Sequence, residues 1–149
     1  MREALRLARE SVAAGGGPFA ALVVRDGAVV AAGTNRVVAE RDPTAHAELV
    51  AIREACRRLG THRLDGCEIY ASCEPCPMCA GAIAWAHPAR VFFAATRDDA
   101  AAAGFDDARL WAEMGRAPAG GTIAAERLLG DEGRGPFDAW AAKPDRKPY

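Results

Sequence analysis

The architecture of this chain is organised around two short segments, Asp42-Pro43-Thr44-Ala45-His46-Ala47-Glu48 and Ser72-Cys73-Glu74-Pro75-Cys76-Pro77-Met78-Cys79. The first leads into apolar residues at helical spacing, and Gly60 ends the helix that they predict. A short apolar run at 68–72, typical of a buried strand, enters the second, where Pro75 opens a helix that reaches about Trp85. Asp42 or Thr44 is expected to cap the first helix. Both segments therefore stand where a helix begins.

The sequence before these segments predicts one helix and a hairpin. Residues 2–14 alternate apolar and charged side chains as an amphipathic helix does, and a Gly-Pro segment at 15–18 ends it. Strands are predicted at 19–25 and 28–32, with Asp26-Gly27 as the hairpin turn between them. Both strands are apolar almost throughout, so helices should cover both faces of the sheet.

The sequence after them predicts a further strand at 91–95 and helices at 98–103 and 107–114. A short edge strand at 122–124, a terminal helix at 137–142 and a polar tail at 143–149 complete the chain. The order of strands and helices predicts a three-layer α/β/α domain. The length of 149 residues fits one domain, 1–149.

Composition narrows the function classes. Half of the residues are apolar and the formal net charge is −1, so no basic field for nucleic acid or an anionic membrane is expected. Charged residues interrupt the N-terminal apolar runs and no stretch reaches the ~20 apolar residues of a membrane span, so a cytoplasmic enzyme is expected. The five cysteines are an odd number, which favours metal or redox chemistry over a disulfide framework.

The two segments together predict a catalytic zinc site. His46, Cys76 and Cys79 are the nitrogen and sulfur ligands that zinc prefers, and three protein ligands leave the fourth position open for water. The two cysteines are three residues apart at a helix start, which places their sulfurs on one face. Glu48 stands two residues after the histidine, near enough to move protons without being a ligand. This H-x-E and P-C-x-x-C pattern is the signature of zinc deaminases.

Two other interpretations of the cysteines stay open. A redox pair would leave the His-x-Glu unexplained, and a structural zinc site would need a fourth ligand such as Cys73. Glu74 is interpreted as a structural residue at the helix start, and the tryptophans as packing residues.

The whole chain resembles the cytidine deaminase superfamily, and within it the guanine deaminase branch. Three segments shared by several branches carry the resemblance: Gly17-Pro18-Phe19-Ala20 and the two segments quoted above. The guanine deaminase branch is indicated by three others: Ala103-Gly104-Phe105-Asp106-Asp107, Pro136-Phe137-Asp138-Ala139-Trp140 and Lys147-Pro148-Tyr149.

The resemblance implies a mixed five-stranded sheet and a homodimer in which the C-terminal segment, about 134–149, crosses to the partner. Tyr149 would then cover the partner's active site, whereas the sequence alone predicts a disordered tail. Asn35 would bind the purine, Phe19 would pack near its ring, and Asp107 would contact its polar edge. A helix N-cap is the alternative role for Asp107.

The activity implied is hydrolytic deamination of guanine to xanthine and ammonia, with Zn²⁺ as cofactor. The alternatives are deamination of tRNA adenosine, cytosine, an aminotriazine or a pterin, and a non-catalytic zinc-stabilised module. The last would have no use for a carboxylate such as Glu48 beside the metal.

Overall fold

The structure is a computed structural model, and it describes residues 1–114, 132, 135–142 and 144. The chain separates into two compact units, Met1–Trp111 and Ala112–Tyr149. The elements of the first unit are α1 (Arg2–Ala13), β1 (Ala20–Arg25), β2 (Ala28–Thr34), α2 (Val37–Glu40), α3 (Ala47–Leu59), β3 (Cys67–Cys73), α4 (Pro77–Ala86), β4 (Arg90–Ala95), α5 (Arg97–Ala102) and α6 (Ala108–Glu113), the last of which runs past Trp111. The second unit contains α7 (Gly135–Ala142), the terminal helix that the sequence predicts.

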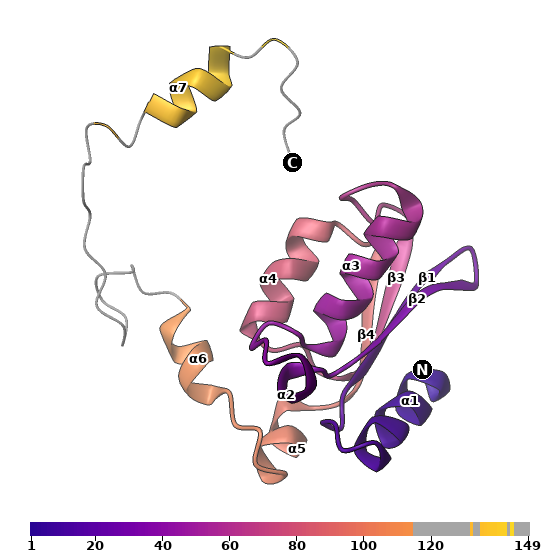
Figure 1. Ribbon diagram of the computed structural model, residues 1–149. Helices are drawn as coiled ribbons and strands as arrows, with labels where there is room; N and C mark the ends of the chain where they lie inside the picture. The colour runs from indigo at the N-terminus through magenta and orange to yellow at the C-terminus, as the bar shows by residue number, and fades with distance from the viewer. Residues whose placement is uncertain (115–131, 133–134, 143, 145–149) are drawn as a thin grey trace. The chain divides into compact units, whose positions relative to one another are not determined.

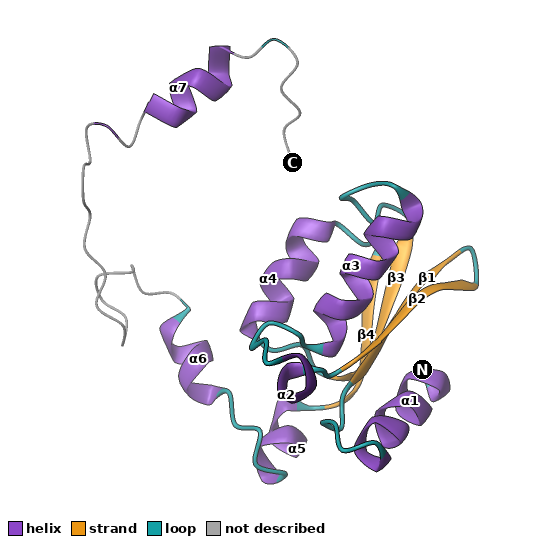
Figure 2. Cartoon of the chain, in the orientation of Figure 1, coloured by secondary structure: helices purple, strands orange, loops and turns teal. Residues whose placement is uncertain are grey.

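The first unit is built on a mixed sheet with the strand order β2-β1-β3-β4 (Figure 1). Strand β1 pairs antiparallel with β2 and β3, and β3 pairs parallel with β4. Helix α1 lies on one face of this sheet and α3 and α4 lie on the other (Figure 2). The predicted three-layer α/β/α architecture is therefore confirmed. The described residues contribute four strands, and the fifth strand expected at 122–124 lies outside them.

The predicted hairpin turn is present between β1 and β2. Asp26 has φ 51° and Gly27 has φ 76°, so both central residues are left-handed, as a type I′ turn requires. Its twist matches that of the two strands, which fixes their register, with Arg25 opposite Ala28.

Helix α3 packs very closely on β2. A Cβ atom added at Gly33 would lie 2.4 Å from the carbonyl oxygen of Ala47 and 2.6 Å from the nitrogen of Ala51. Only glycine fits where two backbones approach this closely. This contact places the start of α3, where His46 and Glu48 lie, directly against the sheet.

The predicted capping of α3 is wrong. The Oδ1 atom of Asp42 accepts hydrogen bonds from the backbone nitrogen and the hydroxyl of Thr44, both at 2.7 Å, so the two side chains close their own turn. His46 is the N-cap residue of α3 and makes no side-chain capping bond. Helix α4 begins at Pro77 with Cys76 as its N-cap, later than the Pro75 start that the sequence predicts. The short helix α2 lies between β2 and α3.

None of the helices formed by the described residues has the length and hydropathy that a membrane-spanning helix requires.

Candidate metal centre

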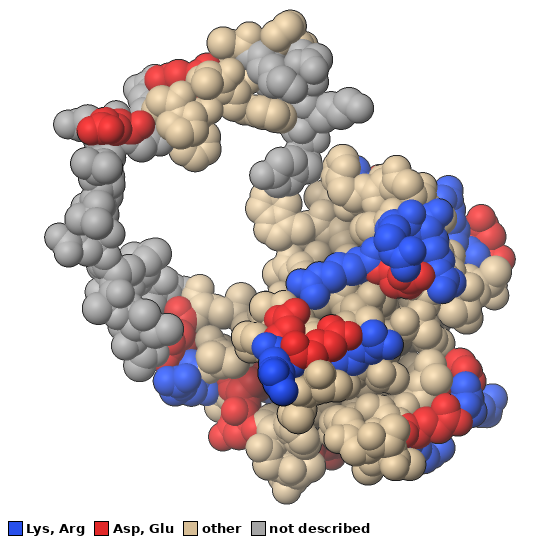
Figure 3. Space-filling view, viewed as in Figure 1, with Lys and Arg blue, Asp and Glu red and all other residues tan. Residues whose placement is uncertain are grey.

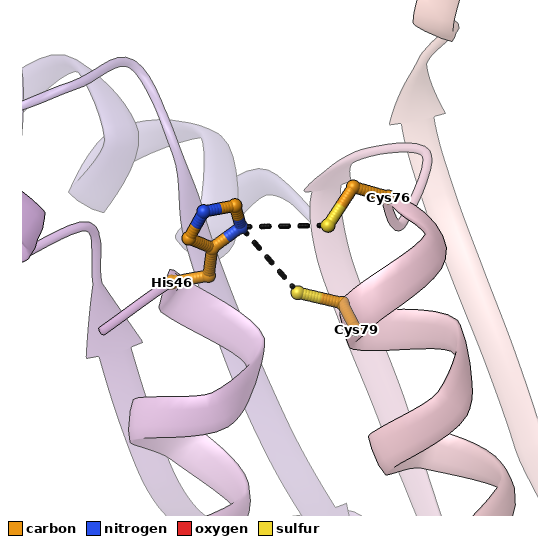
Figure 4. A group of neighbouring side chains, drawn as sticks. All are labelled: His46, Cys76 and Cys79. Atoms are coloured by element: carbon orange, nitrogen blue, oxygen red, sulfur yellow. Dashed lines mark hydrogen bonds between the residues drawn. The ribbon is translucent and has the colours of Figure 1, made fainter. Parts of the chain in front are cut away.

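Two helix starts meet at the centre of the first unit. His46 and Cys76 are the N-cap residues of α3 and α4, both with extended backbone, and Cys79 lies in the first turn of α4. Their three side chains converge in the gap between the two helices (Figure 4). An N-cap residue stands outside the helical hydrogen-bond pattern, so its side chain can be directed across the helix end.

The geometry of these side chains fits zinc. His46 Nδ1 lies 3.5 Å from Cys76 Sγ and 3.6 Å from Cys79 Sγ. Zinc–sulfur bonds of about 2.3 Å and zinc–nitrogen bonds of about 2.0–2.1 Å at tetrahedral angles put such ligand pairs roughly 3.5–3.6 Å apart. All three ligand atoms lie within 4.8 Å of one another. Because no other residue of the described part of the chain joins this group, the site has the three protein ligands of a catalytic centre.

Cys73 is placed apart from this ligand group. Its Sγ donates a hydrogen bond to the backbone oxygen of Thr96 at 3.5 Å, at the junction of β4 and α5. The structural Cys₃His site that the sequence left open is therefore not assembled in the described residues.

Before a metal binds, the contacts within this group favour Cys76 as a thiolate and Cys79 as a thiol. Hydrogen bonds from the Cys79 thiol and then from His46 lower the pKa of Cys76 to about 4, against the effect of burial. The hydrogen bond to Cys76 and burial raise the pKa of Cys79. The hydrogen bond to Cys76 also raises the pKa of His46. A divalent cation would replace the shared protons, which is how zinc binding releases protons.

Glu48 is a buried carboxyl beside this group. It lies in the first turn of α3 and only 8% of its surface is exposed. Burial is the main cause that raises its pKa above the usual carboxyl range. A raised pKa makes the ionised carboxylate a stronger base, which suits Glu48 to accepting and returning a proton.

A cavity of about 510 Å³ opens over these residues. Glu48 lines it together with the ligands His46 and Cys76. The residues predicted to bind the base line the same cavity, namely Phe19, Asn35 and Asp107. The structure thus brings together every predicted site residue that it describes. Tyr149 lies outside the described residues.

Local contacts orient two of the predicted binding residues. The side-chain oxygen of Asn35 accepts a hydrogen bond from Val37 N at 3.3 Å, which makes its NH₂ group the end that can donate to a ligand. The ring of Phe19 meets that of Phe105 edge to face, with centroids 4.9 Å apart. Phe105 also lines the cavity, and no sequence pattern predicts its contact with Phe19.

The side chain of Asp107 does not cap a helix, which was the alternative role considered for it. Asp106 Oδ1 accepts the hydrogen bond from Ala108 N at 2.9 Å, whereas Asp107 Oδ2 accepts one from Trp111 Nε1 at 3.0 Å. Glu74 has a structural role at a helix start, but at α5 and not at α4, because its Oε2 accepts a hydrogen bond from the nitrogen of Arg97, the first residue of α5, at 3.1 Å. The four-residue spacing of Asp107 and Trp111 is compatible with a contact along one helix face, whereas no sequence spacing indicates the contact between Glu74 and Arg97.

An α/β/α domain in which two helix starts present a His-Cys-Cys donor set beside a buried glutamate defines a zinc-dependent hydrolase of the deaminase class. Comparison with known proteins agrees. Residues 1–95 match the family model described as cytidine and deoxycytidylate deaminase zinc-binding region. The chain belongs to this family.

Two relatives differ in how much of the chain they match. Guanine deaminase of Bacillus subtilis (strain 168) is 49% identical over 100% of this chain and 96% of that protein. The X-ray structure of guanine deaminase from Bacillus subtilis superposes with a TM-score of 0.96 at 50% identity, covering 99% of this chain and 95% of the other. The tRNA-specific adenosine deaminase of Aquifex aeolicus (strain VF5) is 43% identical over 64% of this chain and 63% of its own length.

Proposed function

We propose that this protein is a zinc-dependent aminohydrolase that converts free guanine to xanthine and ammonia. One observation carries the choice of base. Phe105 and Asp107 line the same cavity as the zinc ligands, and they lie beyond residue 95, where the family model ends. The similarity to guanine deaminase extends through this segment over the full chain. Base selection therefore rests on α5, α6 and the loop between them.

His46, Cys76 and Cys79 hold the metal in this proposal. When bound, zinc supplies Lewis acidity that makes water a nucleophile near neutral pH. Glu48 takes one proton from the attacking water and delivers it to N3 of the base, and it then carries the remaining hydroxyl proton to the leaving amino group. Burial suits it to this role, because its raised pKa lets it hold a proton between the two transfers. One carboxylate serves both transfers since it lines the cavity next to the ligands.

The remaining cavity residues bind and orient the base. The Asn35 NH₂ group donates to a ring acceptor, and Phe19, held by Phe105, packs against the ring. The Asp107 carboxylate is an acceptor only, so it suits the N–H groups on the polar edge of guanine. A hydrogen-bonding site of this kind discriminates strongly against bases that lack the matching donors.

The charge pattern of the surface weighs against a tRNA substrate. Acidic and basic side chains stand side by side on the face seen in Figure 3. Arg36 pairs with Glu40 at 2.9 Å and Arg53 pairs with Asp42 at 3.8 Å, so carboxylates offset these arginines. Binding to a nucleic acid backbone needs cations that are free to neutralise phosphates.

The test is ammonia release from a panel of guanine, adenine, cytosine, an aminotriazine and a pterin. Guanine should be deaminated fastest, and xanthine should form in equal amount to ammonia. Faster release from any other base would refute the assignment. A salt-dependent gel shift with tRNA would favour the tRNA alternative.

The proposal extends to a cytoplasmic homodimer in which the segment 134–149 crosses to the partner and Tyr149 closes its cavity. The resemblance of the Lys147-Pro148-Tyr149 ending supports it. Mixing a Glu48→Gln chain with a chain lacking 147–149 should restore guanine turnover, because one mixed site unites an intact Glu48 with an intact tail. No recovery after confirmed subunit exchange would rule out the crossing.

A further inference from the structure

The carboxylate of Asp107 lies on a weakly buried part of the cavity wall. The helices on either side of it, α5 and α6, contain no buried residues, and Phe105 and Leu110 are 47% and 45% exposed. A side chain in such a segment samples several rotamers, and fixing it on binding costs affinity. Something in the fold must therefore hold this carboxylate if it is to recognise a base efficiently.

Trp111 is the residue placed to hold it. Its Nε1 donates to Asp107 Oδ2 at 3.0 Å from one turn further along α6. This bond occupies one carboxylate oxygen and leaves Oδ1 to face a ligand. The neighbouring Asp106 is used differently, since its Oδ1 accepts the hydrogen bond from Ala108 N that starts the helix.

The indole ring is itself tied to the metal-bearing segment. The guanidinium of Arg97 lies over the Trp111 ring, 5.8 Å from its centroid, in the range of a cation–π contact. The backbone nitrogen of Arg97 donates to Glu74 Oε2 at 3.1 Å, and Glu74 N donates to Ala95 O at 2.8 Å. Glu74 stands two residues before the ligand Cys76. A continuous set of contacts thus relates the position of Asp107 to the metal centre.

We propose that Trp111 is a positioning residue for base recognition, which acts by holding the Asp107 carboxylate through its indole N–H. Trp111 does not line the cavity, so it acts through Asp107 and does not touch the base. This inference rests on the proposed function, in which Asp107 contacts the polar edge of the substrate. It gives a role in specificity to a tryptophan that the sequence analysis interprets as a packing residue.

A double-mutant cycle tests the proposal. Trp111→Phe removes the N–H donor and keeps an aromatic ring under Arg97. It should lower kcat/KM for guanine about tenfold, mainly through KM, as expected for loss of a hydrogen bond to a charged group. In an Asp107→Ala background the same change should alter kcat/KM less than twofold, because the acceptor is already gone. A packing role would instead give equal losses in both backgrounds and would overturn the proposal.

Two further variants keep the test decisive. Trp111→His retains a ring N–H donor and should recover at least half of the loss in log(kcat/KM), and failure to do so counts against the proposal even if Trp111→Phe folds poorly. Tyr70→Phe is the matched control, since it removes an aromatic donor to a carboxylate, Tyr70 Oη to Glu68 Oε2 at 2.7 Å, outside the cavity lining, and its kcat/KM should not change. Zinc content should stay at the wild-type value in all of these variants.

The cycle is run on whichever base the wild-type enzyme deaminates fastest. If that base is not guanine, the proposed function fails while the coupling between Trp111 and Asp107 is still measured. If it is guanine and the two substitutions are additive, only the inference about Trp111 fails. If no base of the panel is deaminated, both are wrong.

Discussion

Replacing Gly33 by alanine should weaken zinc binding and turnover, although Gly33 is not a residue of the metal centre. Gly33 lies in β2 with an ordinary strand conformation, so alanine meets no backbone strain there. Its Cβ atom would lie 2.4 Å from the carbonyl oxygen of Ala47 and 2.6 Å from the nitrogen of Ala51. Both are backbone atoms of α3, so no side-chain rotation can relieve the overlap.

The size of the disturbance follows from these distances. Ordinary van der Waals contact begins at 3.4 Å, so a separation of 2.4 Å requires β2 and α3 to move apart by 1.0 Å. Ala47 stands between His46 and Glu48, and both would move with it. Overpacking of this kind costs about 1–3 kcal/mol of stability. A misplacement of about 1 Å at a catalytic site can reduce turnover by about 10²-fold.

The assay compares Gly33→Ala with Gly81→Ala, which is the matched control. Gly81 lies within α4, where an added Cβ meets nothing within 4 Å, so its replacement should stabilise the protein by about 0.5–1 kcal/mol. Gly33→Ala should bind zinc more weakly, unfold at a lower temperature and lose about 99% of its ammonia release. Wild-type zinc affinity and turnover in Gly33→Ala would show that the approach of α3 to β2 does not set the ligand geometry.

Three other substitutions separate the parts of the site. Cys79→Ala should lower zinc well below one ion per chain and reduce thermal stability, because metal binding is coupled to folding. Elemental analysis measures the zinc content and a melting curve measures the stability. The control is Cys56→Ala, which replaces a half-buried cysteine outside the ligand group. Glu48→Gln should keep zinc and fold but lose about 10²–10⁴-fold in turnover, and retention of a tenth of the activity would remove its proton-transfer role. Thr96→Ala deletes the capping box with Asp99 that begins α5, and this loss should destabilise α5 by about 1 kcal/mol. The variant should therefore raise KM more than it lowers kcat. Unchanged amide exchange in α5 would contradict this.

The metal centre could be predicted because its signals are local. The histidine motif and the cysteine motif each stand at a helix start, since α3 begins one residue after His46 and α4 begins one residue after Cys76. The hairpin turn at Asp26-Gly27 is equally local, since turn type depends on the residues in the turn. Helix starts were less well predicted. Asp42 and Thr44 have capping chemistry, but their hydrogen bonds to each other leave His46 as the N-cap.

The contacts that shape the cavity could not be predicted, because they join segments far apart in the sequence. Glu74 meets Arg97 only because β3 and β4 lie in parallel register, with Cys73 opposite Ala95. The meeting of Phe19 and Phe105 likewise depends on where α5 ends relative to β1. A pattern of residue types carries no information about such pairs until the sheet order is known.

The two sides of the cavity are held by different forces, which in the proposed function separates the catalytic groups from the recognition groups on α5 and α6. The ligands and Glu48 stand on α3 and α4, which bury apolar side chains against the sheet and one another. The wall formed by α5 and α6 buries none, and it is held by a capping box, the hydrogen bond from Trp111 to Asp107 and the Arg97–Trp111 contact. Polar contacts of this kind are worth about 0.5–3 kcal/mol each, so the wall can be altered without unfolding the core. The family model ends at residue 95, where this wall begins, which is where relatives with different substrates would be expected to diverge. Substitutions in 97–111 should therefore change which base is accepted, while those at the starts of α3 and α4 should abolish deamination of every base.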